Sequence, residues 1–364
     1  MKIVIVSRTI FPLLSPRAFR ATELAKQFAR LGHDVSLYAV TGKYDYTNFC
    51  KETGVKVKPI KMRLGTADSD GNVRYNFLDK IAYHAFGDVL EYPDIEFCWK
   101  VPEILRKEPN TDLLVTVAVP HPIHWGAGIA RKKLKERFPK VWVSDCGDPY
   151  MGNGVGKKHP FYFKWVEKFW GNQTDYVSIP ISSARKAYYS NVQDKIRVIP
   201  QGFNMENVRL SEYKSNAIPS FAYAGSVYPG LRDPSTLLDF LCTVDAEFRF
   251  TVFTNNTSIY EPYKYRLGDK LIIHSFIPRD ELLLELSKQD FLINLINPNH
   301  EQSPSKLIDY YLSKRPILDI STPFNEKVSL LKALAFKLDN WHTPKDVSLF
   351  DIRNVADAFI KLVD

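Results

Sequence analysis

Short apolar runs alternate with longer amphipathic stretches from one end of the chain to the other, and this alternation restricts the fold more than any other feature. The runs have the length of buried strands, and the stretches have the length of helices that connect parallel strands. The pattern predicts an α/β architecture. In the first half, strands are expected at 2–7, 35–40, 55–60, 113–119, 141–145, 176–181 and 196–200. Helices are expected at 17–31, 76–90, 95–107, 124–137, 161–171 and 182–190.

A second series of strands follows a polar segment and predicts a second domain. These strands are expected at 221–226, 248–253, 271–276, 291–296, 316–320 and 335–339. Residues 201–220 are polar, include Pro219 and lack an apolar period, so they are interpreted as a linker. We expect two doubly wound, Rossmann-like domains, 1–200 and 221–364, and the last helix could pack back on the first domain. Such sheets bind ligands beyond the carboxyl ends of their strands, so the expected site is a cleft between the domains.

The composition is that of a globular protein, with 45% apolar and 25% charged residues among 364. No run of about 18 uncharged apolar residues occurs, and the chain passes from Met1-Lys2 directly into a strand-like segment. We therefore expect a cytoplasmic protein, with peripheral attachment to the inner face of the cell membrane as an option. The four cysteines are scattered without a Cys-x-x-Cys pair, which predicts buried, reduced thiols and no zinc cluster.

The positive charge is confined to the first half. Residues 1–200 carry a net charge of +11 (31 Lys and Arg against 20 Asp and Glu), whereas residues 201–364 carry −3 (18 against 21). The excess is concentrated in the run 131–140 and in Lys157-Lys158, which could attract nucleic acid, an anionic membrane surface or a phosphorylated acceptor, or could be a solvated helix face. Nucleic acid is disfavoured because the run lacks the interleaved aromatic residues that bind single strands.

The segment HEQSPSKLIDYY (300–311) places two acids around the start of a helix. Ser303 can cap the first turn, and Pro304 suits the first helical position. The uncovered N–H groups and Lys306 would attract an anion, so Glu301 and Asp309 are expected to bind hydroxyl groups. The alternative is that both acids are ordinary surface residues at the start of a helix.

The order of the elements and this acid pair resemble the GT-B glycosyltransferases of glycosyltransferase family 4. The opening KIVIVSRTIFPLLSPRAFRATELAKQFARLGHDV is similar to the family's first strand, loop and helix. Family members carry two Glu separated by seven residues, and Glu301 and Asp309 have that spacing, followed by YYLSKRPIL. The resemblance implies that Glu301 contacts the donor sugar and Asp309 the ribose hydroxyls, with Ser305, Lys306 and Leu307 beside them in the donor site. Asp309 is one methylene shorter than the family's Glu.

The family resemblance also implies how the donor's diphosphate is held without a bound metal. Members place an Arg after the Gly that ends the second domain's first strand, and a Lys six residues later. In AGSVYPGLRDP, Gly225 fits, Ser226 replaces the Arg, and Arg232 stands at the Lys position. Arg232 and Lys306 would then neutralise the leaving group, unless Arg232 is an ordinary surface residue beside Asp233.

In the first domain, VAVPHPIHWGAG (117–128) is similar to a family loop in which a histidine approaches the donor sugar. His121 is the chosen residue, and His124 is expected to be structural; the two lack a third partner for a metal. SDCGDPYMG (144–152) is similar to an Asp-x-x-Asp-Pro-Trp loop of members that build bacterial surface polysaccharides. This likeness implies that Asp145 and Asp148 hold the acceptor, although Asp145 could equally cap a turn.

Tyr150 replaces the tryptophan of that loop and would still offer an aromatic surface for a sugar. The first loop departs furthest from the family, because LLSPRAFR (13–20) lacks the usual Gly-Gly pair. Arg17 and Arg20 could instead supply charge to a phosphate or the acceptor, or could lie on the helix surface.

These features predict a retaining glycosyltransferase that needs no cofactor. It would move a sugar from a nucleoside diphosphate to a hydroxyl of a glycan or lipid-linked acceptor in capsule, O-antigen or lipopolysaccharide synthesis. One alternative is a nucleotide-sugar 2-epimerase of the same fold, which would turn over its donor without an acceptor. Another is a non-catalytic nucleotide-binding subunit, which the replacements at Ser226 and Asp309 favour.

Overall fold

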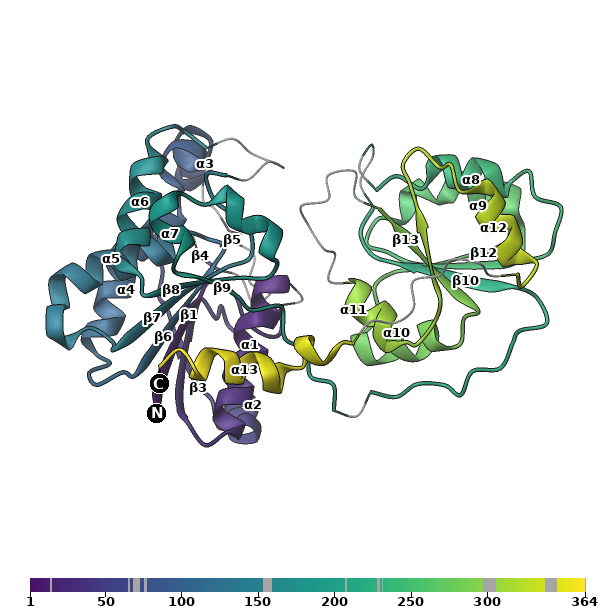
Figure 1. The fold of residues 1–364 in the computed structure, drawn as a ribbon. Helices are drawn as coiled ribbons and strands as arrows, with labels where there is room; N and C mark the ends of the chain where they lie inside the picture. Colours follow the sequence, from purple (N-terminus) through teal and green to yellow (C-terminus); the bar gives the residue numbers. More distant parts are fainter. Residues whose placement is uncertain are drawn as a thin grey trace. The chain divides into compact units, whose positions relative to one another are not determined.

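The computed structural model describes residues 1–13, 15–64, 66–67, 73–74, 77–152, 159–206, 208–227, 230, 232–296, 306–337 and 346–363. It divides into two compact units, drawn in Figure 1. Unit 1 comprises Met1–Asn204 and Leu349–Asp364, and unit 2 comprises Met205–Ser348. None of the described helices is both long and apolar enough to cross a membrane.

Unit 1 contains a sheet of seven parallel strands with helices on both faces. In spatial order the strands are β3 (Lys56–Pro59), β2 (Asp34–Ala39), β1 (Lys2–Ser7), β6 (Leu113–Ala118), β7 (Val141–Cys146), β8 (Tyr176–Ile179) and β9 (Ile196–Val198). One face is covered by α1 (Pro16–Arg30), α2 (Thr47–Thr53) and α13 (Ile352–Ile360). The other is covered by α4 (Phe97–Arg106), α5 (Pro122–Leu134) and α6 (Phe163–Gln173). The strand order changes direction between β1 and β6, as in doubly wound folds.

Close backbone packing positions two of these helices. Gly126 lets α5 approach α4, because a Cβ at this residue would lie 2.2 Å from the carbonyl oxygen of Phe97. Helix α13 packs against α1, and the rings of Phe28 and Phe359 meet edge to face at 6.4 Å. The backbone of Phe203 bonds to Phe350 and Ile352, which ties the last residues of unit 1 to the rest of that unit.

Unit 2 contains a sheet of five parallel strands. In spatial order they are β12 (Leu271–His274), β11 (Arg249–Phe253), β10 (Ser220–Ala224), β13 (Phe291–Leu295) and β14 (Ile317–Ile320). One face packs against α8 (Ser235–Leu241), α9 (Glu261–Leu267) and α12 (Lys327–Leu334), and the other against α10 (Arg279–Ser287) and α11 (Lys306–Leu312). The predicted parallel α/β architecture is confirmed.

Some local predictions are wrong. Residues 335–337, part of an expected strand, form a turn after α12. The helix expected at 182–190 is a 3₁₀ segment, Ser182–Ala187, followed by the short α7 (Ser190–Gln193). Helix α2 and the hairpin of β4 (Thr66–Ala67) and β5 (Val73–Arg74) were not expected. The prediction of buried thiols holds fully for Cys146 alone among the four free cysteines. Cys50, Cys98 and Cys242 lie at partly exposed positions.

Candidate functional site

His121 lies directly before α5, at the carboxyl end of β6 in unit 1. Its side chain is 4% exposed and packs against the rings of Tyr150 at 4.6 Å and His124 at 5.5 Å. Burial, together with the neighbouring His124 and His159, holds the pKa of His121 well below its ordinary value, so the imidazole is neutral. Its Nδ1 makes no hydrogen bond to the described residues. The ring therefore keeps unused hydrogen-bonding capacity.

His124 is held beneath His121 by a chain of side-chain contacts. The Trp142 indole donates to Thr116 Oγ1 at 2.8 Å, and Thr116 Oγ1 lies 2.8 Å from His124 Nδ1. Since the indole can only donate, the Thr116 hydroxyl is free to donate to Nδ1, which leaves the ring proton on Nε2, 3.4 Å from Cys146 Sγ. Burial lowers the His124 pKa to about 3. His124 is thus a fixed, neutral support.

Asp145 and Arg20 form a buried ion pair that joins α1 to the sheet. Arg20 NH2 lies 2.9 Å from Asp145 Oδ1, and Ser178 donates to the same oxygen at 2.5 Å. The guanidinium also donates to the carbonyl oxygens of Ile199 and Pro200. Burial alone would raise the Asp145 pKa, but the two nearby guanidinium groups outweigh it and hold the pKa below its usual range. Both side chains are only 2% exposed, so their bonding groups are used within the fold.

Arg17 is held less firmly. It lies in the first turn of α1, which Ser15 caps by accepting from the Ala18 N–H at 3.2 Å. Its guanidinium reaches Asp145 and Gln201 only at 3.5 Å. It packs on Gly147, where a Cβ would lie 2.7 Å from the guanidinium carbon. Arg17 is thus a cation at the carboxyl edge of the sheet with longer, weaker bonds than Arg20.

The loop after β7 contains one exposed and one buried candidate. Asp148 is exposed, whereas Tyr150 is 3% exposed and its ring lies between His121 and His159, the latter 3.9 Å away. Its hydroxyl donates to Glu91 Oε1 at 2.9 Å. In this structure Tyr150 therefore offers no open face for a sugar and instead supports the His121 ring.

Glu167 lies under the same loop and was not indicated by the sequence. It is fully buried on α6, and its Oε2 accepts from the backbone N–H of Met151 at 3.1 Å. Oε1 makes no hydrogen bond to the described residues. Burial raises the Glu167 pKa to about 7, even though the Met151 bond lowers it.

Replacing Glu167 by Gln should increase stability above neutral pH. The folded pKa lies above the unfolded value, so the carboxyl favours folding below about pH 4.5 and loses that contribution as the pH rises through about 7. The Gln side chain keeps the Met151 bond without burying a charge. The difference in free energy of unfolding between Glu167→Gln and wild type should grow to about 3 kcal/mol by pH 8, measured by denaturant titration across pH. A difference independent of pH would contradict this account.

In unit 2, Gly225 directly follows β10 and has a φ of +148°, a value that favours glycine. Arg232 is partly buried, and its Nε makes no hydrogen bond to the described residues. The adjacent Asp233 accepts instead from Ser235, at 2.6 Å from its hydroxyl, and from the Gly230 N–H. The Arg232 guanidinium is therefore not occupied by its neighbouring acid.

Helix α11 carries the acid of the second domain. Asp309 Oδ1 lies 2.8 Å from Arg279 Nε and 2.7 Å from Arg279 NH2, a pairing that the sequence did not indicate. Burial raises the Asp309 pKa, and Arg279 partly offsets this. Tyr310 accepts from the Ala224 N–H at 2.8 Å and donates to Ile293, which ties α11 to the strand end beside Gly225. Leu307 packs on the same face.

Several predicted residues lie outside the described part of the chain. Glu301 and Ser305, with the helix start at Ser303 and Pro304, are among them, and the side chain of Lys306 is not described. The described part of α11 begins at Lys306. Among the described residues, no group of three His, Cys, Asp or Glu is arranged to hold a metal ion.

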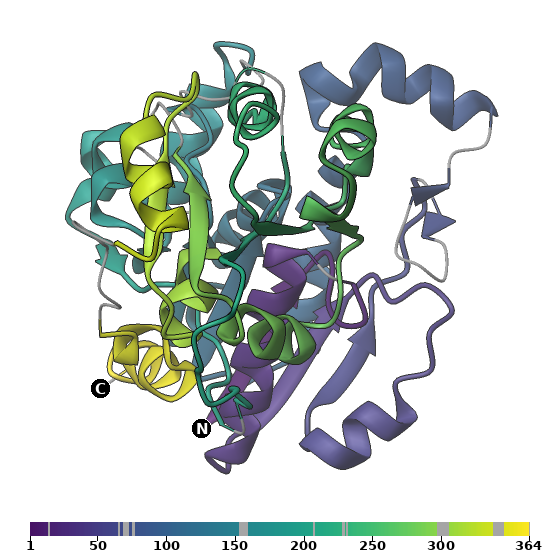
Figure 2. The ribbon, with the colours of Figure 1, turned by 90° about the vertical axis from the view of Figure 1, so that its right-hand side faces the viewer.

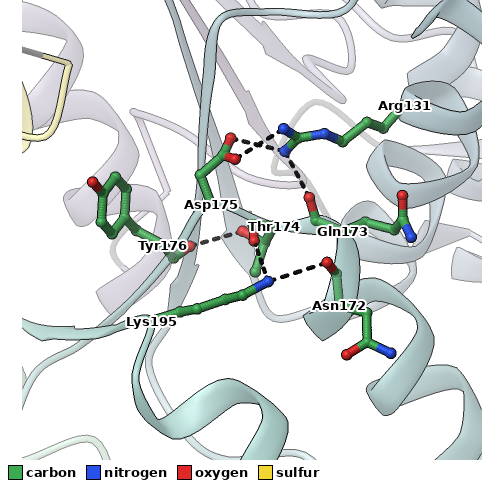
Figure 3. A pocket seen from close by; sticks show the side chains of 7 residues that line it. All are labelled: Arg131, Asn172, Gln173, Thr174, Asp175, Tyr176 and Lys195. Carbon is green, nitrogen blue, oxygen red and sulfur yellow. Dashed lines mark hydrogen bonds and ion pairs between the residues drawn. The ribbon is translucent and has the colours of Figure 1, made fainter.

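A surface hollow of about 380 Å³ lies at the other edge of the unit 1 sheet, where β8 begins (Figure 3). Its cations are already bonded. Lys195 donates to the carbonyl oxygens of residues 171, 172 and 174, and Arg131 pairs with both oxygens of Asp175 at 2.8 and 2.9 Å. The two cations therefore hold the end of α6 in place. The hollow lies at the amino-terminal ends of the strands, far from the carboxyl ends that carry His121 and Asp148.

Three of the solved structures that are similar to this chain illustrate the likeness. A glycosyltransferase from Rickettsia africae is 14% identical, with 100% of this chain and 93% of that chain covered and a TM-score of 0.60. Anabaena Alr3699/HepE, solved with UDP and glucose, is 10% identical, with 99% and 98% covered and a TM-score of 0.60. The lipopolysaccharide outer core galactosyltransferase WaaB is 13% identical, with 99% and 95% covered and a TM-score of 0.60. These likenesses confirm the GT-B fold.

The comparison with curated proteins gave no match. The family model for Glycosyltransferase Family 4 matches residues 19–207, which is more than half of the chain. The chain therefore belongs to glycosyltransferase family 4, and it is a glycosyltransferase of the GT-B fold.

Proposed function

We propose that this glycosyltransferase retains the anomeric configuration of its sugar and takes that sugar from a nucleoside diphosphate. The acceptor is a hydroxyl of a glycan or lipid-linked molecule in capsule, O-antigen or lipopolysaccharide synthesis. The observation that carries the proposal is the Tyr310 hydroxyl, which bonds α11 to the end of β10. This bond holds α11, the helix that carries Asp309, against the strand end that Gly225 follows, and the ribose and diphosphate of the donor are proposed to bind there. The Anabaena structure with UDP and glucose supports the same class of donor.

The reaction breaks the bond between the anomeric carbon and the diphosphate oxygen and forms one to the acceptor oxygen. In the proposed mechanism the departing phosphate takes the acceptor proton on the same face of the sugar. Arg232 and Lys306 neutralise the charge that develops on the diphosphate. The neutral His121 bonds the donor sugar near the anomeric carbon, and Glu301, expected from the sequence alone, bonds its hydroxyls. Asp148 holds the acceptor hydroxyl.

We further propose that the acceptor is carried on the anionic inner face of the cell membrane, which attracts the basic run 131–140. Arg131 is paired with Asp175, and the Lys132 ammonium lies 4.9 Å from the Phe169 ring centre. The run still exposes the side chains of Lys133, Lys135 and Arg137. These cations add long-range attraction that salt would weaken.

The proposed donor can be tested with a panel of UDP-, GDP- and dTDP-sugars, scored by thermal shift and by slow hydrolysis. At least one of these nucleotide sugars should raise the melting temperature of the protein and be hydrolysed slowly to its nucleoside diphosphate. Epimerised donor formed without an acceptor would instead indicate a 2-epimerase. Tight nucleotide binding with no turnover under any acceptor would indicate a non-catalytic subunit.

Asp309→Ala should weaken nucleotide affinity by roughly 10- to 100-fold, because the ribose loses a charged hydrogen-bond acceptor. Arg279→Met should have a smaller effect that grows as the pH falls, since loss of the guanidinium lets the buried carboxyl gain a proton more easily. Calorimetric titration with the free nucleotide measures both. An unchanged dissociation constant for Asp309→Ala would remove this residue from the ribose site.

A further inference from the structure

Helix α3 (Phe77–Leu90) is apolar yet has no buried side chain among its described residues. Phe77 is 76% exposed, and Ile81, Phe86 and Leu90 are each about half exposed. Figures 1 and 2 show this helix at the rim of unit 1, outside the layers that cover the sheet. Apolar helices in globular proteins normally bury one face, so an exposed one indicates a partner.

The exposed apolar surface continues from α3 onto the start of α6. The Tyr162 hydroxyl donates to the carbonyl oxygen of Val89, which joins the end of α3 to this region. Beside Tyr162, Phe161 is 68% and Trp165 is 58% exposed, and their rings lie 5.8 Å apart. We call Phe77, Ile81, Phe86, Leu90, Phe161 and Trp165 the α3–α6 surface.

The charges beside this surface favour one kind of partner. Among the described side chains of α3, Lys80 and Asp88 are both exposed and offset each other, so the net charge of the described residues beside the surface comes from α6. There Glu167 is buried, whereas Lys168 is exposed and the Lys164 ammonium lies 5.0 Å from the Trp165 ring centre. Lys132, at the start of the basic run, lies over Phe169 on the same helix. Aromatic and aliphatic side chains fringed by lysines match the headgroup boundary of an anionic bilayer, where aromatic rings settle and ammonium groups meet phosphates.

The surface is connected to the candidate site by one residue. Glu91 follows α3, and its Oε1 accepts from the Tyr150 hydroxyl at 2.9 Å and lies 3.4 Å from His159 Nδ1. Tyr150 in turn packs against His121. The loop that carries His121 is therefore held at a fixed place relative to the end of α3.

We infer that the α3–α6 surface docks into the headgroup boundary of an anionic bilayer and presents the His121 edge of unit 1 to acceptors held there. This inference rests on the proposed function, because only a membrane-borne acceptor makes such docking useful. It goes beyond the attraction expected from the basic run, since insertion of apolar side chains resists salt, whereas attraction between charges does not.

The test uses flotation of the full chain with vesicles of neutral lipid and with vesicles holding about 30% anionic lipid, at physiological and high salt. Ile81→Ser with Phe86→Ser and, separately, Phe161→Ser with Trp165→Ser should each reduce binding about tenfold or more. The matched control is Tyr265→Ser in unit 2, which removes a side chain that is 96% exposed and should leave binding unchanged. Melting temperatures should stay the same because all these side chains are exposed.

Full binding by both double variants, or no binding by the wild type, would overturn the inference. So would a dimer of the wild type that the same variants break, seen by analytical ultracentrifugation, because the surface would then join two copies of the chain. Donor hydrolysis in the absence of lipid should be equal in all variants. Vesicle binding without turnover of any nucleotide sugar would therefore refute the proposed function and leave the docking surface intact.

Discussion

Replacing Asp145 by Ala is expected to lower the free energy of unfolding of unit 1 by about 3–5 kcal/mol, because the variant leaves a buried charge without its partner. Arg20 is 2% exposed and would lose its three hydrogen bonds to the carboxylate, and Ser178 would lose its acceptor. Denaturant titration followed by tryptophan fluorescence measures the effect. The signal reports mainly on unit 1, since five of the six tryptophans lie there.

Asp148→Ala provides the matched control. Asp148 lies three residues further on and is exposed, so its removal should change stability by less than about 0.5 kcal/mol. It should instead reduce transfer to the acceptor, if this carboxylate holds the acceptor hydroxyl. Equal stability losses in the two variants would contradict the assignment of a structural role to Asp145 and a functional role to Asp148.

Replacing His121 by Phe should reduce kcat roughly 10²- to 10³-fold, the usual effect of losing one hydrogen bond to a developing transition state. The Phe ring can keep the packing against Tyr150 and His124, so the melting temperature should change little. His121→Gln, which keeps a hydrogen-bonding group, should recover part of the activity. Initial rates at saturating donor measure these changes, and the affinity for free nucleotide should stay constant.

The pH profile adds a second readout for His121. Because burial holds its pKa well below the ordinary value, the ring stays neutral between pH 6 and pH 8. The wild-type rate should therefore show no loss from protonation of His121 over this range. A rate that falls near pH 6.5 in the wild type and not in His121→Gln would show that the imidazole is charged in the working enzyme.

The parallel sheets were predictable because their strands are buried on both faces. Such strands appear in the sequence as continuous apolar runs, for example KIVIVS and LLVTVA. The family was also predicted from the resemblance of the quoted segments, and the family model over residues 19–207 confirms it. The acid pair Glu301 and Asp309 lies outside that match and stays a prediction.

Short elements were not predictable from the sequence. The segment AFKLD has the composition of a strand, but Ala335 follows α12 directly and its N–H bonds back to the helix. Helix α2 has no fully buried side chain and so leaves no strong period in the sequence.

The positions of the candidate residues in the fold were predictable, whereas their contacts were less so. Strand ends locate His121, Asp145 and Asp148 correctly at one edge, because parallel strands deliver their carboxyl ends together. Burial is decided by helices distant in the sequence, which is why Arg20 closes on Asp145, 125 residues away. The partners Arg279 and Glu91 could not be found for the same reason, since neither lies in a recognisable motif.

The most direct test of the account is the stereochemistry of the transferred sugar. The donor that stabilises the protein would be incubated with a lipid-linked or glycan acceptor, and the anomeric configuration of the product compared with that of the donor by proton NMR. The account predicts transfer with the configuration kept and release of the nucleoside diphosphate. A product of inverted configuration, or transfer that does not release a nucleoside diphosphate, would contradict it.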